Sequence, residues 1–253
     1  MYPHRSTIAE GILMEWFPPF FSLEKGKGIS KVFIICGGMP GVPNKQKLME
    51  FLAKKGYWVL FPRYRGTWES SGRFLDHDPY KDVIDVIDAL STPFISAFSG
   101  EQGQILQPEV YIIGGSFGGP AAMLASSDAR VKKVVTVAGV VDWTVSGEEE
   151  HMDDLLHMVK DGFGEAYRFD DAAWQELSQG MFYNPVTMGD LIDYKKVLMI
   201  HAKDDMVVPH GTSESFARKN NISFISTKKG GHLSTSILTR WSLWRKVKKY
   251  LAL

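Results

Sequence analysis

Residues 110–126, VYIIGGSFGGPAAMLAS, carry the clearest structural signal in the chain. An apolar run leads into glycines that surround Ser116, and small residues that favour a helix follow them. Gly114, Ser116 and Gly118 fit the pattern G-x-S-x-G, which is typical of a sharp turn from a buried strand into a helix. Glycines on both sides relieve the steric crowding at such a turn. The serine is then either an exposed nucleophile or a polar residue in a tight connection.

Strand-like and helix-like segments alternate on both sides of this turn. The expected strands cover residues 12–17, 31–36, 57–62, 109–114, 131–139, 196–202 and 222–227. The expected helices cover residues 44–56, 78–90, 119–127, 210–220 and 234–253, and residues 18–31 are expected to form an exposed hairpin or loop. This alternation predicts an α/β fold with a mostly parallel sheet and helices on both faces. Active residues should then follow strands, at the carboxyl edge of the sheet.

Composition narrows the class of protein. A length of 253 residues suits one α/β domain, and 29 basic residues balance 29 acidic ones. A neutral chain gives no reason to expect nucleic acid or a membrane as a partner. The single cysteine, Cys36, excludes an intrachain disulfide and a cysteine-based metal site. Residues 1–16 lack the features of a signal peptide and no stretch is long and apolar enough to span a membrane, so we expect a cytoplasmic protein.

A serine hydroxyl becomes a nucleophile only with a general base within hydrogen-bond reach. His232 is the candidate base, because it follows an expected strand and lies in a loop directly after Gly230 and Gly231. The glycine pair would let the imidazole approach Ser116 closely. His201 ends a strand, but we expect it to lie too close in sequence to the candidate acid Asp205 to face it across the site.

The base in turn needs an acid that orients it and stabilises its charged form. Asp204 and Asp205 follow the expected strand 196–202, and Asp142 follows the expected strand 131–139. All three sit where a catalytic acid is expected, although adjacent aspartates are also common in solvated turns. The residues by themselves leave the choice among the three open.

Two backbone amides are candidates for stabilising an oxyanion. The Phe117 N–H follows the serine at the start of the next helix, where the helix dipole favours negative charge. The loop GGMPGVPN after strand 31–36 is the expected place for the second donor, and Met39 N–H is our candidate. The alternative is that this loop is a glycine-rich turn without a ligand.

The order Ser116, Asp205, His232 resembles that of the α/β-hydrolase superfamily, over nearly the whole chain. Three stretches resemble more narrowly the prolyl-oligopeptidase and dienelactone-hydrolase branch: YRGTWESSG (64–72), YNPVTMGDLIDYKKVLMIHAKDDMVVP (183–209) and KGGH (229–232). The branch's D-x-x-V-P motif is matched by Asp205, Val208 and Pro209. The resemblance therefore selects Asp205 as the acid and implies an α/β-hydrolase fold.

The same resemblance implies a cap over the site. Residues 143–190 interrupt the strand–helix rhythm, first acidic and then aromatic, at the point where this superfamily inserts a small helical cap. We therefore expect a single domain over residues 1–253 with a cap insertion at about 143–190. Trp143 and Phe182 from this insertion, and Trp68 from the Arg-Gly loop, are our candidates for lining a pocket for an apolar or aromatic acyl group. The alternative is that these aromatics only cover the edge of the sheet.

Departures from the family pattern bear on the reaction. The Tyr or His that precedes the family's paired oxyanion-loop glycines is missing, and Cys36 or Gly37 stands there instead. Oligopeptidases use that tyrosine hydroxyl to hold the oxyanion, and we expect this chain to have no N-terminal propeller either. The resemblance thus implies a serine hydrolase of carboxylic esters that acts on a small acyl substrate and needs no cofactor or metal.

Other functions fit the same residues. A small peptidase or amidase and an acyltransferase would use the same triad, and a catalytically silent binding protein could keep the fold.

The final helix, with Trp241, Leu243, Trp244, Val247 and Leu251 among basic residues, is expected to pack on the sheet. A homodimer contact through this helix is the alternative.

Overall fold

The computed structural model describes residues 2–21 and 29–253 of the chain. Within them an eight-stranded sheet has the order β1-β2-β4-β3-β7-β8-β9-β10. Its strands are β1 (His4–Ala9), β2 (Ile12–Phe17), β3 (Ser30–Cys36), β4 (Trp58–Pro62), β7 (Pro108–Gly115), β8 (Val131–Val137), β9 (Val197–Ala202) and β10 (Ser223–Thr227). β1 and β2 pair antiparallel, as do β2 and β4, and the other neighbours pair parallel. The predicted mostly parallel sheet is confirmed.

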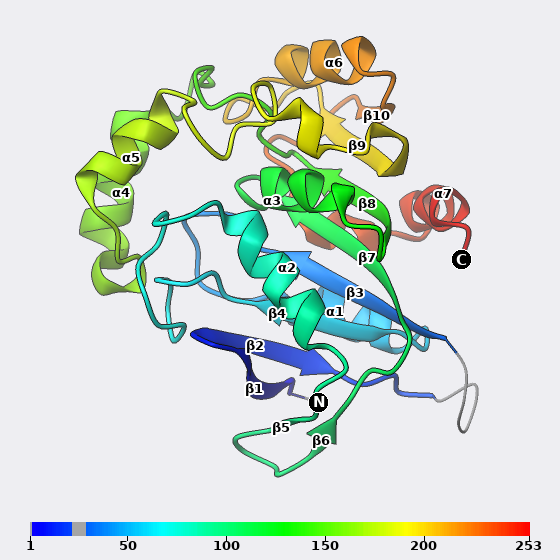
Figure 1. The fold of residues 1–253 in the computed structure, drawn as a ribbon. Coiled ribbons are helices and arrows are strands. Elements are labelled where there is room, and N and C mark those ends of the chain that lie inside the picture. The colour runs from blue at the N-terminus through cyan, green and yellow to red at the C-terminus, as the bar shows by residue number, and fades with distance from the viewer. Residues whose placement is uncertain (1, 22–28) are drawn as a thin grey trace.

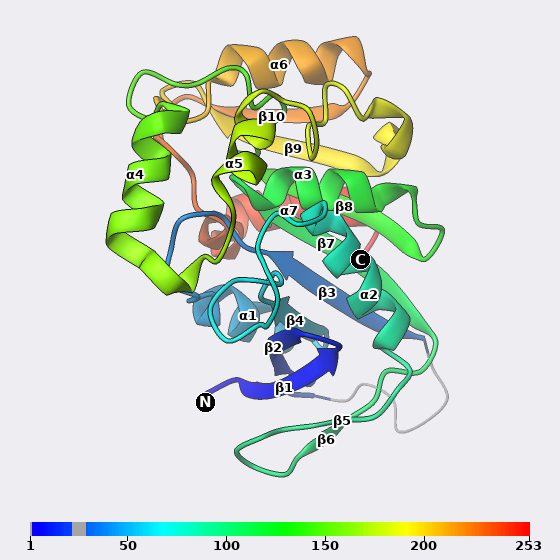
Figure 2. The same cartoon turned by 60° about the vertical axis from the view of Figure 1, so that its left-hand side comes forward.

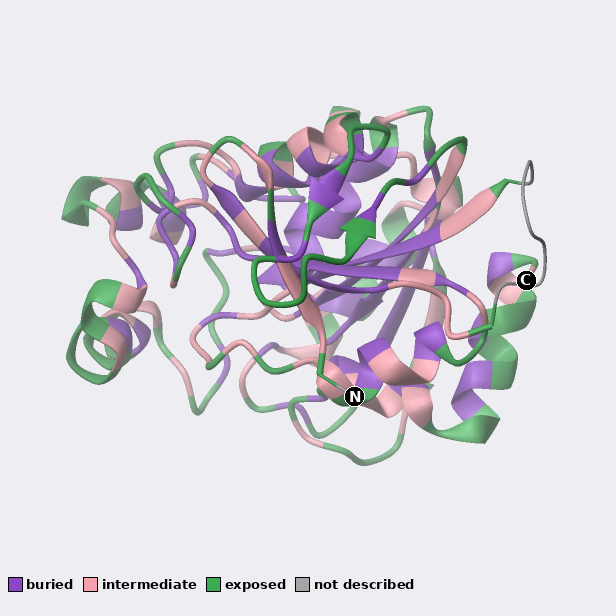
Figure 3. Ribbon diagram, turned by 90° about the horizontal axis from the view of Figure 1, so that it is seen from below, coloured by how far each residue is buried: buried purple, intermediate pink, exposed green. Residues whose placement is uncertain are grey.

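Helices cover both faces of the sheet (Figure 1). They are α1 (Gln46–Ala53), α2 (Pro79–Ala89), α3 (Gly118–Leu124), α4 (Met152–Phe163), α5 (Asp171–Ser178), α6 (His210–Lys219) and α7 (Trp241–Leu251). Apolar side chains of α2, α3 and α6 join one core cluster, and those of α1 and α7 join the other. The central strands lie between the two clusters and are buried along most of their length (Figure 3). None of the helices in the described ranges is long and apolar enough to cross a membrane.

Side-chain alternation explains why the central strands are apolar on both faces. In β3, Val32 and Ile34 point into one cluster while Phe33 and Ile35 point into the other. A strand covered on both sides therefore reads as a continuous apolar run, as the sequence of β3 does. The sheet is thus a rigid platform, and the loops at its carboxyl edge are held in fixed positions.

The elements differ from the predicted ones in three places. β1 was not expected, and it adds an antiparallel edge strand beside β2. The expected final helix is broken: a 3-10 turn (Thr235–Thr239) comes first, and α7 starts only after Arg240, which has an extended backbone. A short hairpin, β5 (Phe94–Ile95) with β6 (Gln102–Gly103), follows α2. Of the expected loop at 18–31, residues 22–28 lie outside the described residues.

The segment between β8 and β9 contains α4 and α5, which lie at the carboxyl edge of the central strands (Figures 1 and 2). Backbone contacts fasten this segment to the Arg-Gly loop, residues 64–72. Thr67 and Tyr167 form an isolated antiparallel bridge, and the Trp68 N–H donates to the Ala166 carbonyl at 2.8 Å. The Arg168 N–H donates to the Gly66 carbonyl at 2.8 Å, and just beyond the loop the Phe74 N–H donates to the Arg168 carbonyl at 2.6 Å. The segment therefore closes one side of the space above the strand ends.

Candidate active site

Ser116 lies at the turn between β7 and α3 with a φ of +50°. A non-glycine residue rarely adopts this left-handed conformation, and such strain is concentrated at functional sites. Two glycines make the turn possible. A Cβ atom on Gly114 would lie 2.2 Å from the Gly118 carbonyl oxygen, and one on Gly118 would lie 2.3 Å from the Cys36 carbonyl oxygen. The glycines of the G-x-S-x-G pattern are therefore needed because helix α3 packs directly against the strand ends.

Hydrogen bonds hold the Ser116 backbone in this conformation. Its N–H donates to the Val137 carbonyl of β8 at 3.2 Å, and its carbonyl accepts from the N–H groups of Gly119 and Val140. With its backbone fixed, the serine side chain projects beyond the strand end and lines a cavity there. This is the position that an attacking hydroxyl requires.

Asp205 and His232 are in direct contact. Nδ1 of His232 lies 3.0 Å from Oδ2 and 3.2 Å from Oδ1 of Asp205. A carboxylate only accepts hydrogen bonds, so Nδ1 carries the proton and Nε2 is left as an acceptor. His232 lines the same cavity as Ser116. The structure therefore brings the three predicted triad residues to one place, from the ends of three strands.

The carboxylate of Asp205 is buried and well supplied with donors. The N–H groups of Val207 and Val208 both donate to Oδ1 at 3.0 Å. Burial acts to raise the pKa of Asp205, but hydrogen bonds from His201, His232 and the Val208 N–H outweigh it and hold the pKa well below its usual value. The carboxylate therefore stays ionised and can stabilise a charged imidazole.

His201 is a contact that the sequence argument missed. Its Nε2 lies 3.1 Å from Asp205 Oδ2 and 2.9 Å from the Val208 carbonyl oxygen, and the residue is buried. We expected His201 to be too near Asp205 in sequence to face it. His201 does not face Asp205 across the cavity. The turn after β9 folds back instead and places Asp205 against the strand end that carries His201. The spacing of four residues around such a turn was the signal that could have revealed this contact.

The rival acids make other contacts. Asp204 accepts hydrogen bonds from the Gly230 and Gly231 N–H groups, at 3.2 and 2.9 Å. It thereby fixes the loop that carries His232. Asp142 caps its own turn, accepting from the Thr144 N–H at 3.0 Å and the Thr144 hydroxyl at 2.8 Å. Asp205 is therefore the acid that the geometry pairs with His232.

The two candidate oxyanion donors lie on either side of the serine. A Cβ atom on Gly38 would lie 3.3 Å from the Ser116 Cβ, so the loop that carries Met39 runs very close to the serine. Met39 lines the cavity, and neither its N–H nor that of Phe117 donates a hydrogen bond to another described residue. The Phe117 N–H shares its peptide with the Ser116 carbonyl, which the Gly119 and Val140 N–H groups hold at 2.9 and 3.2 Å. The next peptide is held as well, because the Phe117 carbonyl accepts from the Tyr183 hydroxyl at 2.6 Å. Both amides are thus held near Ser116 without another acceptor.

The cavity above Ser116 has a volume of about 340 Å³. Its side-chain walls are mostly apolar and aromatic: Val42, Phe61, Tyr64, Trp68, Met158, Tyr167, Val207 and Leu233 line it. Trp68 is where the sequence predicted it. Tyr167 and Met158 come from the segment between β8 and β9, so this segment contributes to the pocket. Such a volume and lining suit a small, partly apolar ligand.

Two of the predicted pocket residues do not line this cavity. Trp143 is buried in the core, where its Nε1–H donates to the Tyr183 carbonyl at 2.8 Å. Its ring packs against Phe117, with centroids 5.6 Å apart. Phe182 packs partly buried against the same core cluster. The chain bends towards the core at both ends of the segment between β8 and β9, and Trp143 thereby packs against the residue that follows the nucleophile.

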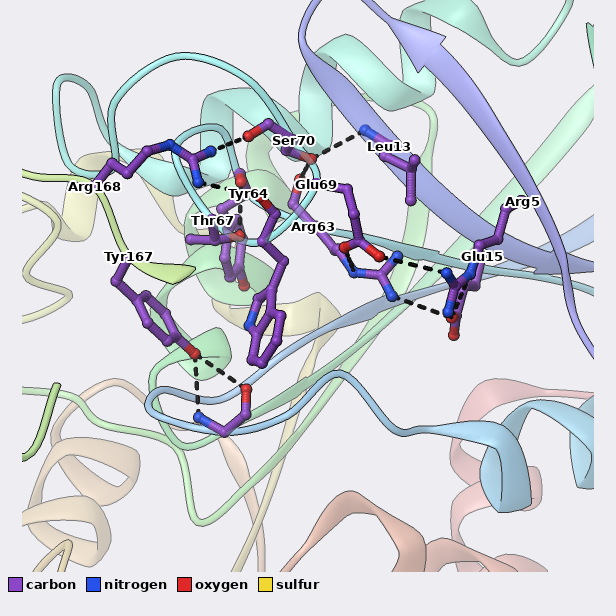
Figure 4. Close-up of polar contacts among 12 residues, drawn as sticks. Arg5, Leu13, Glu15, Arg63, Tyr64, Thr67, Glu69, Ser70, Tyr167 and Arg168 are labelled. Carbon is purple, nitrogen blue, oxygen red and sulfur yellow. Dashed lines mark hydrogen bonds and ion pairs between the residues drawn. The ribbon is translucent and has the colours of Figure 1, made fainter. Parts of the chain in front are cut away.

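Side chains from the same segment fasten the loops around the cavity (Figure 4). The Tyr167 hydroxyl contacts the Gly41 backbone, 3.1 Å from its nitrogen and 3.3 Å from its carbonyl oxygen. Arg168 donates to the carbonyls of Trp68, at 3.1 Å, and of Ser70. The loop with Met39 and the loop with Trp68 are therefore both tied to one short stretch, residues 166–168.

Three charged side chains other than His232 line the cavity: Lys45, Arg63 and Glu150. The charge of Arg63 is compensated, since its Nη2 donates to Glu15 at 3.1 Å and its Nε lies 2.9 Å from a Glu69 oxygen (Figure 4). Arg65, in the same loop, lies away from the cavity and donates to Asp82 and Asp85. Among the described residues, no group of three or more metal-ligating side chains could hold a metal ion.

Comparisons with known proteins agree with this geometry. The sequence profile of the prolyl oligopeptidase family matches residues 44–239. A search of curated protein sequences finds no match. Among solved structures, acylaminoacyl peptidase from Pyrococcus horikoshii is similar at 19% identity with a TM-score of 0.63, over 98% of this chain and 41% of that one. The chain therefore spans less than half the length of that peptidase.

Shorter relatives resemble the chain along nearly their whole length. An esterase from Pyrococcus furiosus is 17% identical with a TM-score of 0.65, over 100% of this chain and 90% of that one. An α/β serine hydrolase without a lid from Xanthomonas campestris is 14% identical with a TM-score of 0.63, over 99% and 96%. These likenesses show the fold, and the profile match shows the family. The chain is an α/β hydrolase that belongs to the prolyl oligopeptidase family.

Proposed function

We propose that the protein hydrolyses carboxylic esters through an acyl-enzyme intermediate on Ser116. The observation that carries this proposal is the 3.0 Å contact between His232 Nδ1 and Asp205, in a cavity that Ser116 also lines. Because Asp205 engages Nδ1, Nε2 is the nitrogen of His232 that we assign as the base. A serine on a strained turn, a base and an ionised acid are the parts that acyl transfer requires.

The reaction follows from these positions. Ser116 Oγ attacks the ester carbonyl while His232 Nε2 takes the hydroxyl proton, and the carbonyl oxygen becomes an oxyanion. The Met39 and Phe117 amides donate to that oxyanion. The intermediate collapses and expels the alcohol, which takes the proton from His232. Water then attacks the acyl-serine with His232 again as the base, and the acid is released as Ser116 regains its proton.

Ester rather than peptide cleavage is supported by the wall next to the oxyanion loop. Cys36 or Gly37 stands where the oligopeptidases that the chain resembles have a tyrosine. Tyr64 lines the cavity, but its hydroxyl donates to the Gly37 carbonyl at 3.3 Å and is therefore engaged. We therefore assign the oxyanion to the Met39 and Phe117 amides, without a tyrosine hydroxyl beside them. An alkoxide leaves more readily than an amine, so an ester requires less stabilisation of the intermediate than an amide.

A panel of substrates tests this proposal. The purified protein is assayed with 4-nitrophenyl esters of increasing acyl length and with aminoacyl 4-nitroanilides, beside Ser116→Ala. We expect turnover of the short esters, loss of that turnover in Ser116→Ala, and little or no turnover of the anilides. Cleavage of the anilides alone would contradict the proposal and favour a peptidase, as the similarity to acylaminoacyl peptidase would allow.

A further inference from the structure

Lys45 is a cation in the cavity wall without a partner. It lies at the end of the loop after β3, directly before α1, and lines the same cavity as Ser116. No ion pair or hydrogen bond joins its ammonium group to any residue in the described ranges. Arg63, the other basic residue of the wall apart from His232, is neutralised by Glu15 and Glu69. Lys45 is therefore the positive charge that remains for a ligand.

Lys45 is half-buried and has no charged partner. Burial lowers its pKa, and no charged neighbour contributes to that shift. Removing an ammonium group from water is costly unless a counter-charge compensates it. Helix α1 also begins at this point without a side-chain cap or an acidic residue in its first turn. The positive end of its dipole therefore adds to the field of Lys45.

The opposite charge in the cavity belongs to Glu150, beside the triad. Burial raises the pKa of Glu150, the charge of His232 lowers it and the charge of Asp205 raises it. The backbone places Glu150 beside the loop that carries Asp205, because the Gly147 and Glu149 N–H groups donate to the Val207 and Met206 carbonyls at 3.1 and 3.0 Å. Lys45 comes instead from the loop after β3, directly before α1. The cavity thus has a negative side chain at the His232 end and a positive one elsewhere in its wall.

The chemistry of the reaction indicates which part of the substrate lies near each of the two charges. His232 must reach the leaving oxygen in order to protonate it, so the leaving group lies at the end with Glu150. The acyl part then occupies the rest of the cavity. We propose that Lys45 binds a carboxylate carried by the acyl part of the substrate, so that the preferred substrates are monoesters of short dicarboxylic acids. This inference rests on the ester hydrolysis proposed above.

The two charges select the orientation of such a substrate. An ammonium–carboxylate hydrogen bond at a half-buried site is stronger than one in bulk water. Glu150 would repel an anion from the leaving-group end, so the same carboxylate on the alcohol part would be rejected. A cavity of about 340 Å³ leaves room for a short acyl chain between Ser116 and Lys45. The length of the acyl chain should therefore affect which dicarboxylic monoesters are preferred.

Two esters of equal acyl length test the proposal: mono-4-nitrophenyl glutarate, which carries a carboxylate, and 4-nitrophenyl pentanoate, which does not. The quantity measured is the ratio of their kcat/KM values in wild type, Lys45→Met and Lys45→Arg. Lys47→Met is the matched control, because Lys47 is exposed and does not line the cavity. Thermal unfolding of each variant establishes that it is folded.

We expect the ratio of glutarate to pentanoate ester to fall about ten- to a hundred-fold in Lys45→Met, as for loss of a hydrogen bond to a charged group. Lys45→Arg should keep most of the ratio, and Lys47→Met should leave it unchanged. An unchanged ratio in Lys45→Met, with the pentanoate ester still hydrolysed, would overturn the role of Lys45 and leave the esterase proposal intact. Failure of the wild type to hydrolyse either ester would overturn both.

Discussion

Nε2 of His201 lies 3.1 Å from Oδ2 of Asp205 and 2.9 Å from the carbonyl oxygen of Val208. Both neighbours are acceptors, so Nε2 carries a proton that it shares between them. The carboxylate of Asp205 therefore accepts from histidines on two sides, His201 within the fold and His232 at the cavity. His201 is thus a positioning residue, because it fixes the carboxylate that in turn orients the base.

Replacing His201 should weaken catalysis without removing it. In His201→Leu the carboxylate loses one of its donors and is held less firmly by those that remain, so we expect kcat for 4-nitrophenyl esters to fall about tenfold or more while KM changes little. In His201→Gln the side-chain amide nitrogen reaches about as far as Nε2 and can still donate, so this variant should recover much of the loss. Steady-state kinetics of the two variants measure the difference.

His210 provides the control for this experiment. Its ring lies 5.8 Å from that of His201, but its Nε2 contacts the Ser226 hydroxyl instead of Asp205. His210→Asn should therefore leave kcat close to the wild-type value. Equal losses in the His201 and His210 variants would mean that the effect reflects general destabilisation.

Single asparagine variants of the three aspartates should differ clearly in kcat. Asp205→Asn removes the charge that orients His232 and stabilises its protonated form, so we expect kcat to fall by about three to four orders of magnitude. Asp204→Asn loosens the Gly230–Gly231 loop and should cost about tenfold or less. Asp142→Asn affects its own turn and a long contact from the Asn184 amide, both away from His232, and should leave kcat close to the wild-type value. Esterase assays of the three variants measure this order, and a larger loss in Asp142→Asn than in Asp205→Asn would refute it.

Replacing Trp143 should affect stability, whereas replacing Trp68 should affect the preference for the acyl chain. Trp143 is buried beneath the nucleophile, so Trp143→Ala should lower the free energy of unfolding by about 3–5 kcal/mol. Trp68 lines the cavity, so Trp68→Ala should reduce kcat/KM more for long acyl chains than for acetyl. Urea denaturation and an ester series distinguish the two effects. A shift in acyl preference confined to Trp143→Ala would place the pocket elsewhere.

Asp205 should also make the free energy of unfolding depend on pH in the acid range. Because its pKa is lowered in the folded protein, the unfolded chain takes up the proton first as the pH falls. The contribution is then complete above the unfolded pKa of about 4 and is lost as the pH falls further. Urea denaturation between about pH 5 and 3 should show a steeper loss for wild type than for Asp205→Asn. Parallel curves for the two proteins would contradict the lowered pKa.

The fold could be predicted largely from local signals. Strands buried on both faces are continuous apolar runs, and the glycines around Ser116 mark the turn before α3. β1 could not be found in this way, because it is an edge strand of mixed polarity whose burial depends on its neighbours. The break at Arg240 was missed because the apolar spacing continues across it.

The site was only partly predictable for a related reason. Ser116, Asp205 and His232 each follow a strand, so topology alone brings their backbones to one edge of the sheet. The cavity wall depends on side-chain directions in long loops, which local patterns do not encode. Lys45 and Glu150 were therefore missed, and Trp143 was expected in the wall although its chain segment bends into the core.

The central claim is that Ser116 is the nucleophile, and covalent labelling tests it most directly. The wild-type protein and Ser116→Ala are treated with a fluorophosphonate, and the adduct is located by mass spectrometry of the intact protein and of its peptides. Our account predicts one adduct, on Ser116, with loss of esterase activity, and no adduct in Ser116→Ala. An adduct on another residue, or a wild-type protein that hydrolyses esters without being labelled, would contradict it.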